Sequence, residues 1–154
     1  MSKNKAIVVV GHSDWGKSKT LKALTGGNIH KVRVNIKGYD ICIKRMSNDD
    51  EPEKEKLLNY LQEIDPNIKP IILITLCPDF DDSSKKTNKI LKLLSNKYNN
   101  IFFWVLKRKY GSIEEVSNDE IQMLKSFGKV SVFSDKAEAS DRALELERFI
   151  KSVL

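Results

Sequence analysis

Cysteine is scarce in this chain of 154 residues: Cys42 and Cys77 each lie in an apolar segment, with no second Cys or His at ligand spacing. This scarcity argues against a disulfide framework or a structural zinc site and favours a reducing cytoplasm. Long apolar runs are also missing, and the longest, Ile71 to Cys77, is far too short to span a bilayer. The N-terminal run Ala6 to Val10 is too brief for a signal peptide. We therefore expect a cytoplasmic protein without a membrane segment.

Glycine and proline are few, at 7 and 4 residues, and no linker rich in them divides the chain. Hydrophobic residues make up 40% and charged residues 31%, a globular balance, so we expect a single domain over residues 1–154. The net charge of +6 is uneven, because residues 1–45 carry ten Lys and Arg against two Asp. Such clustered positive charge suits a partner rich in phosphate, either a nucleotide or a nucleic acid, although no dedicated nucleic-acid motif is present.

Short apolar runs alternate along the chain with segments of helical periodicity. Two alternating runs that meet at Lys37-Gly38 predict an antiparallel hairpin. Strands that alternate with helices indicate a mostly parallel sheet covered on both faces, a three-layer α/β fold with one antiparallel edge strand from the hairpin. The expected strands are 6–10, 32–36, 39–43, 71–76, 101–106 and 130–133, and the expected helices are 18–25, 57–64, 90–98, 117–127 and 139–153.

Residues 11–18 read Gly-His-Ser-Asp-Trp-Gly-Lys-Ser and match the pattern G-x-x-x-x-G-K-[ST]. Gly11 and Gly16 would allow a tight turn that a Cβ would prevent, so that successive N–H groups form an anion nest at the start of the next helix. Lys17 would reach the β- and γ-phosphates, and Ser18 would coordinate Mg²⁺. A buried strand enters the motif and an amphipathic helix leaves it, as the motif requires. The predicted phosphate-binding residues are Gly11, His12, Ser13, Asp14, Trp15, Gly16, Lys17, Ser18 and Lys19, with Lys17 catalytic.

With this motif the sequence resembles the P-loop NTPase family, and its segment order is most similar to that of small GTPase-like domains. The resemblance implies a P-loop NTPase fold that binds ATP or GTP with Mg²⁺. Two family motifs are degenerate. Lys44 or Arg45 stands where the acid of an Asp-x-x-Gly motif is expected, which puts Mg²⁺ handling and the usual switch in doubt. Lys109 stands where the acid of the guanine-reading Asn-Lys-x-Asp motif is expected, which favours ATP over GTP.

The base and the metal need further residues. Lys107 and Lys109 are candidates to contact the base, and Ser134 and Lys136 echo the family's Ser-Ala-Lys motif, although Asp135 between them also suits a helix cap. Asp79 follows the strand 71–76, at the sheet edge where open α/β sheets bind ligands. Asp79 is therefore the first candidate for a Mg²⁺-linked carboxylate beside Ser18, with Asp49 and Asp50 next; it could equally begin a solvated loop.

Three further side chains complete the candidates. His12 could face the γ-phosphate, although variable positions of such loops usually point outward, and Thr25 could act as a switch-like Mg²⁺ ligand. His30, which precedes an expected strand, is expected to have a structural role. The sequence suggests no Ser-His-Asp or Cys-His arrangement.

The main functional hypothesis is a slow Mg²⁺-dependent NTPase that acts as a switch or regulatory module, since no water-orienting residue is evident. A protein partner would stimulate it or read its bound state. The alternatives are a small P-loop kinase that transfers the γ-phosphate and a catalytically inactive nucleotide-binding or interaction module.

Overall fold

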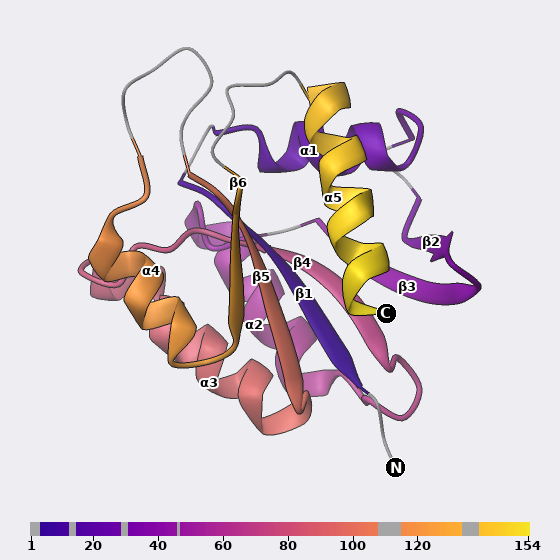
Figure 1. The fold of residues 1–154 in the computed structure, drawn as a ribbon. Helices are drawn as coiled ribbons and strands as arrows, with labels where there is room; N and C mark the ends of the chain where they lie inside the picture. Colours follow the sequence, from indigo (N-terminus) through magenta and orange to yellow (C-terminus); the bar gives the residue numbers. More distant parts are fainter. Residues whose placement is uncertain (1–3, 13–14, 29–30, 46, 108–114, 134–138) are drawn as a thin grey trace.

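The chain forms a twisted sheet between two layers of helices (Figure 1). The computed structural model describes residues 4–12, 15–28, 31–45, 47–107, 115–133 and 139–154. The strands in them are β1 (Lys5–Val10), β2 (Arg33–Ile36), β3 (Tyr39–Lys44), β4 (Ile71–Leu76), β5 (Asn100–Leu106) and β6 (Lys129–Phe133). The α-helices are α1 (Lys17–Leu24), α2 (Glu51–Glu63), α3 (Thr87–Lys97), α4 (Asn118–Lys125) and α5 (Ala139–Val153), and a 3-10 turn, η1, covers Ser83–Lys85.

The sheet has the order β2-β3-β4-β1-β5-β6. β1 pairs in parallel with β4 and β5, β3 pairs in parallel with β4, and β6 pairs in parallel with β5. Of the strands in the described residues, only β2 runs antiparallel, through its hairpin with β3, which turns at Lys37 and Gly38 with φ of 58° and 82°. The predicted three-layer α/β fold with a mostly parallel sheet and one antiparallel edge strand is confirmed.

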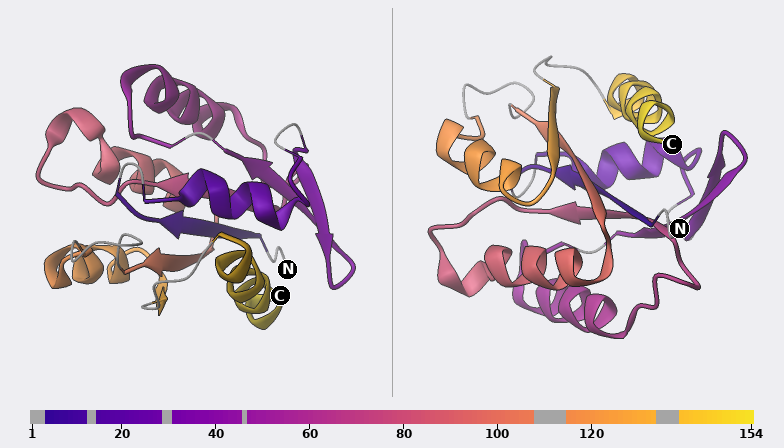
Figure 2. Two further views of the ribbon diagram at one scale, coloured as in Figure 1. Left: turned by 90° about the horizontal axis from the view of Figure 1, so that it is seen from above. Right: turned by 60° about the horizontal axis from the view of Figure 1, so that its bottom comes forward.

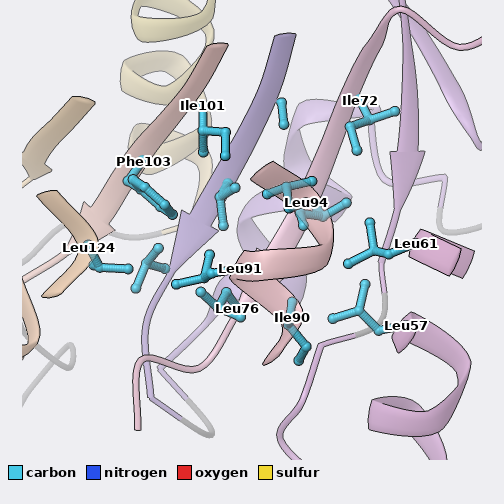
Figure 3. Close-up of a cluster of buried hydrophobic side chains, with 14 of the residues drawn as sticks. Leu57, Leu61, Ile72, Leu76, Ile90, Leu91, Leu94, Ile101, Phe103 and Leu124 are labelled. Carbon is cyan, nitrogen blue, oxygen red and sulfur yellow. The ribbon is translucent and has the colours of Figure 1, made fainter. Parts of the chain in front are cut away.

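Each face of the sheet carries its own apolar core, because residues of the central strands alternate between the two faces. Helices α2, α3 and α4 cover one face, and α1 and α5 cover the other (Figure 2). On the first face Leu61 of α2, Leu91 of α3 and Leu124 of α4 pack over strand residues such as Ile72 and Phe103 (Figure 3). Leu21 of α1 and Leu146 of α5 are fully buried on the second face.

Local signals explain where two of the helices begin. Ser117 and Glu120 form the predicted capping box at the start of α4, each side chain binding the other's backbone N–H. Asp50 caps α2 by accepting a hydrogen bond from the backbone N–H of Glu53 at 2.9 Å. The cap suggested at Asp135 lies outside the described residues. None of the helices described here combines the length and the apolarity needed to cross a bilayer.

The parallel strands bring their carboxyl ends to one edge of the sheet. β1 ends at Val10, β4 at Leu76, β3 at Lys44 and β5 at Leu106, so the segments that follow these strands converge there. The backbone N–H of Gly11 donates to the carbonyl of Leu76 at 3.1 Å, which joins the segment after β1 to the end of β4. This edge is where open α/β sheets bind ligands.

Candidate functional site

The segment 11–16 connects the buried strand β1 to the N-terminus of α1. Its last residue, Gly16, is the N-cap of α1, and no side chain of the described residues caps this helix end. The first N–H groups of a helix have no acceptor within it, so this terminus offers donors and the positive end of the helix dipole. It opens on a cavity of about 520 Å³ lined by Trp15, Gly16, Lys17, Ser18, Lys19, Asp49, Asp50 and Glu53.

Only one of the two motif glycines needs to be glycine for conformational reasons. Gly16 has φ of 92°, and a Cβ there would lie 2.4 Å from Nη2 of Arg142. Gly11 is not among the positive-φ glycines, and its Cβ would meet Lys17 Cγ and Leu106 at 3.4 and 3.5 Å, which are ordinary contacts. The expectation that both positions exclude a Cβ is therefore confirmed for Gly16 and wrong for Gly11.

Lys17 is the buried cation of the site, with only 4% of its surface exposed. Its ammonium donates to the carbonyl of Gly11, to the carbonyl of His12 at 3.2 Å and to Oδ1 of Asp49 at 3.0 Å. A buried ammonium is stable only when such partners replace its hydration. The two carbonyls and the carboxylate hold Lys17 at the floor of the cavity, and a bound anion would compete with Asp49 for it.

Asp49 is held in place by the residues around it. Its neighbour Asn48 is fully buried and donates from Nδ2 to the carbonyl of Cys77 at 3.2 Å and to Oγ1 of Thr87 at 2.9 Å, while its Oδ1 accepts from the N–H of Cys77 at 2.7 Å. The carbonyl of Asp49 accepts from Nζ of Lys85 at 2.5 Å. These bonds tie the segment after β3 to the end of β4 and aim the Asp49 carboxylate at Lys17.

Three acidic residues line the same cavity as Lys17. Asp49, Asp50 and Glu53 contribute its carboxylates. Burial, with the nearby charges of Asp50 and Asp49, raises the pKa of Glu53 above its ordinary value, and Lys17 acts against this rise. Glu53 therefore holds a proton more readily than a carboxyl group free in water.

Asp79 lies outside this cavity. Its Oδ1 accepts a hydrogen bond from the N–H of Asp82 at 3.2 Å, within its own loop, and Asp79 is not among the residues that line the cavity. Among the acids suggested as metal partners, the structure brings Asp49 and Asp50 to Lys17 and Ser18.

The structure describes some of the remaining candidate residues and not others. The ammonium of Lys107 donates to the carbonyl of Val116 at 2.7 Å, which joins the end of β5 to the segment before α4. Thr25 is the C-cap of α1, about 12 Å from its N-terminus at the helical rise of 1.5 Å per residue. The candidates Ser13, Asp14, His30, Lys109, Ser134 and Lys136 lie outside the described residues.

Arg45, one of the two residues at the expected position of an acid, has a structural role. Its Nη2 donates to Oγ1 of Thr25 at 3.0 Å, to the carbonyl of Asn28 at 3.0 Å and to that of Lys31 at 2.9 Å. These hydrogen bonds join the segment between α1 and β2 to the end of β3. The side chain of Lys44 instead lies over the Tyr60 ring, with Nζ 5.1 Å from its centroid.

The structure brings together a Cys-His-carboxylate group that the sequence did not suggest. The imidazole of His12 places Nε2 at 3.1 Å from the Glu120 carboxylate and Nδ1 at 3.8 Å from Sγ of Cys77. Sequence reasoning proposed no Cys-His constellation and could not detect this contact, because Cys77 and Glu120 are 65 and 108 residues from His12 in the chain. No local spacing could reveal contacts of such separation. Cys77 is only 2% exposed, and a buried thiol is shielded from reagents, so no nucleophilic role follows.

These contacts change the protonation of His12. The hydrogen bonds to Cys77 and Glu120 raise the pKa of His12 from 6.5 to about 9, against the opposing effect of burial. Burial acts to raise the pKa of Glu120, but the bonds from His12 and Ser117 lower it below its ordinary value overall. The pair is therefore an imidazolium and a carboxylate at neutral pH.

One residue near the loop, Arg142, was not predicted by sequence reasoning, and one predicted phosphate-binding residue, Trp15, lies in the core. Arg142 of α5 is 6% exposed, donates from Nε to Oγ1 of Thr20 at 3.0 Å and packs against Gly16. No sequence signal marks it, because its partners are over a hundred residues away. Trp15 is 6% exposed and belongs to the core on the α2–α4 face, where its ring meets His12 edge-on at 5.0 Å.

The groups at the cavity are of the chemical kinds that bind a phosphate chain and Mg²⁺. An uncapped helix terminus and a buried ammonium suit a phosphate, and the Ser18 hydroxyl and Asp49 carboxylate are oxygen donors of the kind that Mg²⁺ prefers. Among the described residues no three His, Cys, Asp or Glu side chains could by themselves hold a metal ion.

The sequence matches no protein-family model, and no curated protein matches it.

Proposed function

We propose that this chain is a P-loop nucleoside-triphosphate-binding protein that uses residues 11–19 to bind ATP or GTP with Mg²⁺ and hydrolyses it slowly as a switch or regulatory module. The observation that carries the proposal is the position of Lys17. Its buried ammonium lies between a strand at the centre of the sheet and an uncapped helix terminus, and it faces a cavity of about 520 Å³. A turn that bound nothing would have no need of a buried cation there.

Each group at the cavity has a defined role in this proposal. The N–H groups of the first turn of α1 bind phosphate oxygens, and Lys17 exchanges its bond to Asp49 for one to the phosphate chain. Ser18 and Asp49 are the residues that would hold Mg²⁺, which neutralises charge on the phosphates. Asp49 takes the place first given to Asp79, because it is the carboxylate that contacts Lys17.

Slow turnover follows from the residues around the cavity. Among its described lining residues the candidates to accept a proton from water are carboxylates, and Glu53 is the one with a raised pKa. No Gln or Arg lines this part of the cavity to orient water or to stabilise the transition state. A protein partner that supplied such a group would stimulate hydrolysis.

Calorimetric titration with ATP and GTP, with and without Mg²⁺, tests the proposal. We expect Mg²⁺-dependent binding that Lys17→Ala abolishes and that Lys22→Ala preserves, because Lys22 is exposed in the last turn of α1, away from the cavity. Phosphate release in the same samples measures hydrolysis. Failure of the wild-type protein to bind either nucleotide refutes the proposal, and transfer of labelled γ-phosphate to a second substrate supports the kinase alternative.

A substitution at Asp49 gives a sharper result, because the sign of its effect depends on the metal. Without Mg²⁺, Asp49→Asn should strengthen nucleotide binding, since the carboxylate competes with phosphate for Lys17 and repels it. With Mg²⁺ the same change should weaken binding, since an oxygen ligand loses its charge. Asp79→Asn is the matched control and should change neither affinity. An Asp49→Asn effect of the same sign in both conditions contradicts the assignment of Asp49.

A further inference from the structure

His12 organises the phosphate loop through both its main chain and its side chain. Its carbonyl accepts hydrogen bonds from the backbone N–H of Trp15 and from Nζ of Lys17, both at 3.2 Å. Its ring meets the Trp15 ring edge-on. The orientation of Lys17 therefore depends on where His12 is held.

Two elements outside the loop hold the His12 ring. Glu120, in the first turn of α4, binds Nε2, and the same carboxylate accepts the backbone N–H of Ser117 at 2.9 Å, which limits its movement. Cys77, directly after β4, faces Nδ1. With Lys17 at the His12 carbonyl, these are the titratable groups in contact with His12 among the described residues.

The charge balance beside the loop depends on both members of the pair. The Glu120 side chain is 19% exposed and the His12 side chain 26%, so solvent screens them only in part. When His12 is charged, the pair is neutral. Without that charge, Glu120 would leave one uncompensated carboxylate next to a loop that must accept a highly anionic ligand.

We propose that His12 is a positioning residue of the phosphate site. Its charged ring, anchored by Glu120, orients the His12 carbonyl that accepts a hydrogen bond from Lys17. The same charge cancels that of Glu120, so that the loop can accept a triphosphate. This inference rests on the proposed function. It assigns to position 12 a role that the loop motif leaves open, because the motif specifies only the residues at 11, 16, 17 and 18.

The two members of the pair should respond differently to substitution. His12→Gln leaves the Glu120 carboxylate unpaired, and we expect roughly tenfold weaker ATP binding at low salt, from repulsion between this charge and the phosphates. Glu120→Gln should weaken binding less, since a glutamine keeps the capping box of α4 and leaves no carboxylate that would repel the phosphates. The double variant should bind ATP more tightly than His12→Gln alone. A residue needed only for folding would not show such recovery.

The pH dependence of ATP binding provides an independent measurement. Between pH 7 and pH 10, loss of the proton from His12 should weaken binding to the wild-type protein. His12→Gln, which lacks the imidazole, reports any change that other titrating groups cause in the same interval. Asp119→Asn is the matched control, because Asp119 is an exposed carboxylate in the same turn of α4, and it should behave as the wild type.

Proton NMR of the two histidines tests the pair without any nucleotide. The signal that His12→Gln removes should titrate near pH 9 in the wild type and in Asp119→Asn, and at a lower pH in Glu120→Gln, which keeps the hydrogen bond to Cys77 but loses the carboxylate. A midpoint near pH 6.5 in the wild type overturns the inference and leaves the proposed function intact. A midpoint near pH 9, with ATP affinity unchanged in His12→Gln or with no recovery in the double variant, refutes the link to phosphate binding. A midpoint near pH 9 in a protein that binds no nucleotide refutes the proposed function and, with it, the role at the phosphate site.

Discussion

Alanine at the two glycines of the loop should have very different effects on stability. At Gly16 the φ of 92° costs a residue with a Cβ about 1–2 kcal/mol. The new Cβ would also lie 2.4 Å from Nη2 and 3.2 Å from Cζ of Arg142, so the buried guanidinium must move. Nη2 is the far end of a flexible side chain, so its shift need not break the 3.0 Å bond from Nε to Thr20 Oγ1. That bond joins a charged group, whose hydrogen bonds contribute about 1.5–3 kcal/mol, and weakening it adds part of this cost. We expect Gly16→Ala to lower the free energy of unfolding by about 2–4 kcal/mol.

Gly11→Ala is the matched comparison, since it adds the same methyl group five residues earlier. Its Cβ would make ordinary contacts with Lys17 Cγ at 3.4 Å and Leu106 at 3.5 Å. The alanine would also restrict the unfolded chain, which favours the folded state by about 0.4–1 kcal/mol where the backbone suits it. We therefore expect the free energy of unfolding to change by less than about 1 kcal/mol.

Urea denaturation followed by circular dichroism measures both variants against the wild type. For a domain of this size each kcal/mol corresponds to about 2–4 °C in the midpoint of thermal unfolding. Gly16→Ala should therefore unfold roughly 10 °C lower than the wild type, and Gly11→Ala within a few degrees of it. Equal losses in the two variants, or a larger loss for Gly11→Ala, would refute this account of the loop.

Two further predictions concern the groups that hold the site. Asn48→Ala leaves the buried N–H of Cys77 without its 2.7 Å acceptor and should lower the free energy of unfolding by about 2–4 kcal/mol in urea denaturation, whereas a loss below 1 kcal/mol would contradict the role of Asn48 as an anchor. Because folding raises the pKa of His12, its contribution is complete below pH 6.5 and is lost as the pH rises through about 9. This contribution is about 1–2 kcal/mol after screening. Between pH 7 and pH 10 the free energy of unfolding, measured by denaturation, should therefore fall more for the wild type than for Glu120→Gln. Equal falls would count against the ion pair.

The sequence by itself determined the features that depend on neighbours along the chain. Residues 5–24 form a strand, a glycine-containing turn and a helix in succession. Each of these elements can be predicted from local periodicity and turn residues. The Lys37-Gly38 hairpin and the Ser117–Glu120 capping box are similarly local, since a turn or a cap involves residues two or three positions apart. These local features also led to the three-layer α/β fold, because strands that alternate with helices have few ways to bury both faces of a sheet.

The tertiary structure decided which side chains meet at the site. Asp49 and Asp79 both follow strands that end at the same edge, so the sequence could not tell which carboxylate turns to Lys17. Anchoring by Asn48 directs Asp49 to Lys17, 32 residues away, while Asp79 binds within its own loop. The position of the His12 ring likewise depends on its contact with Cys77, which lies beside it because β1 and β4 are neighbours in the sheet. Contacts of this length depend on strand order and helix packing, which no short stretch of sequence encodes.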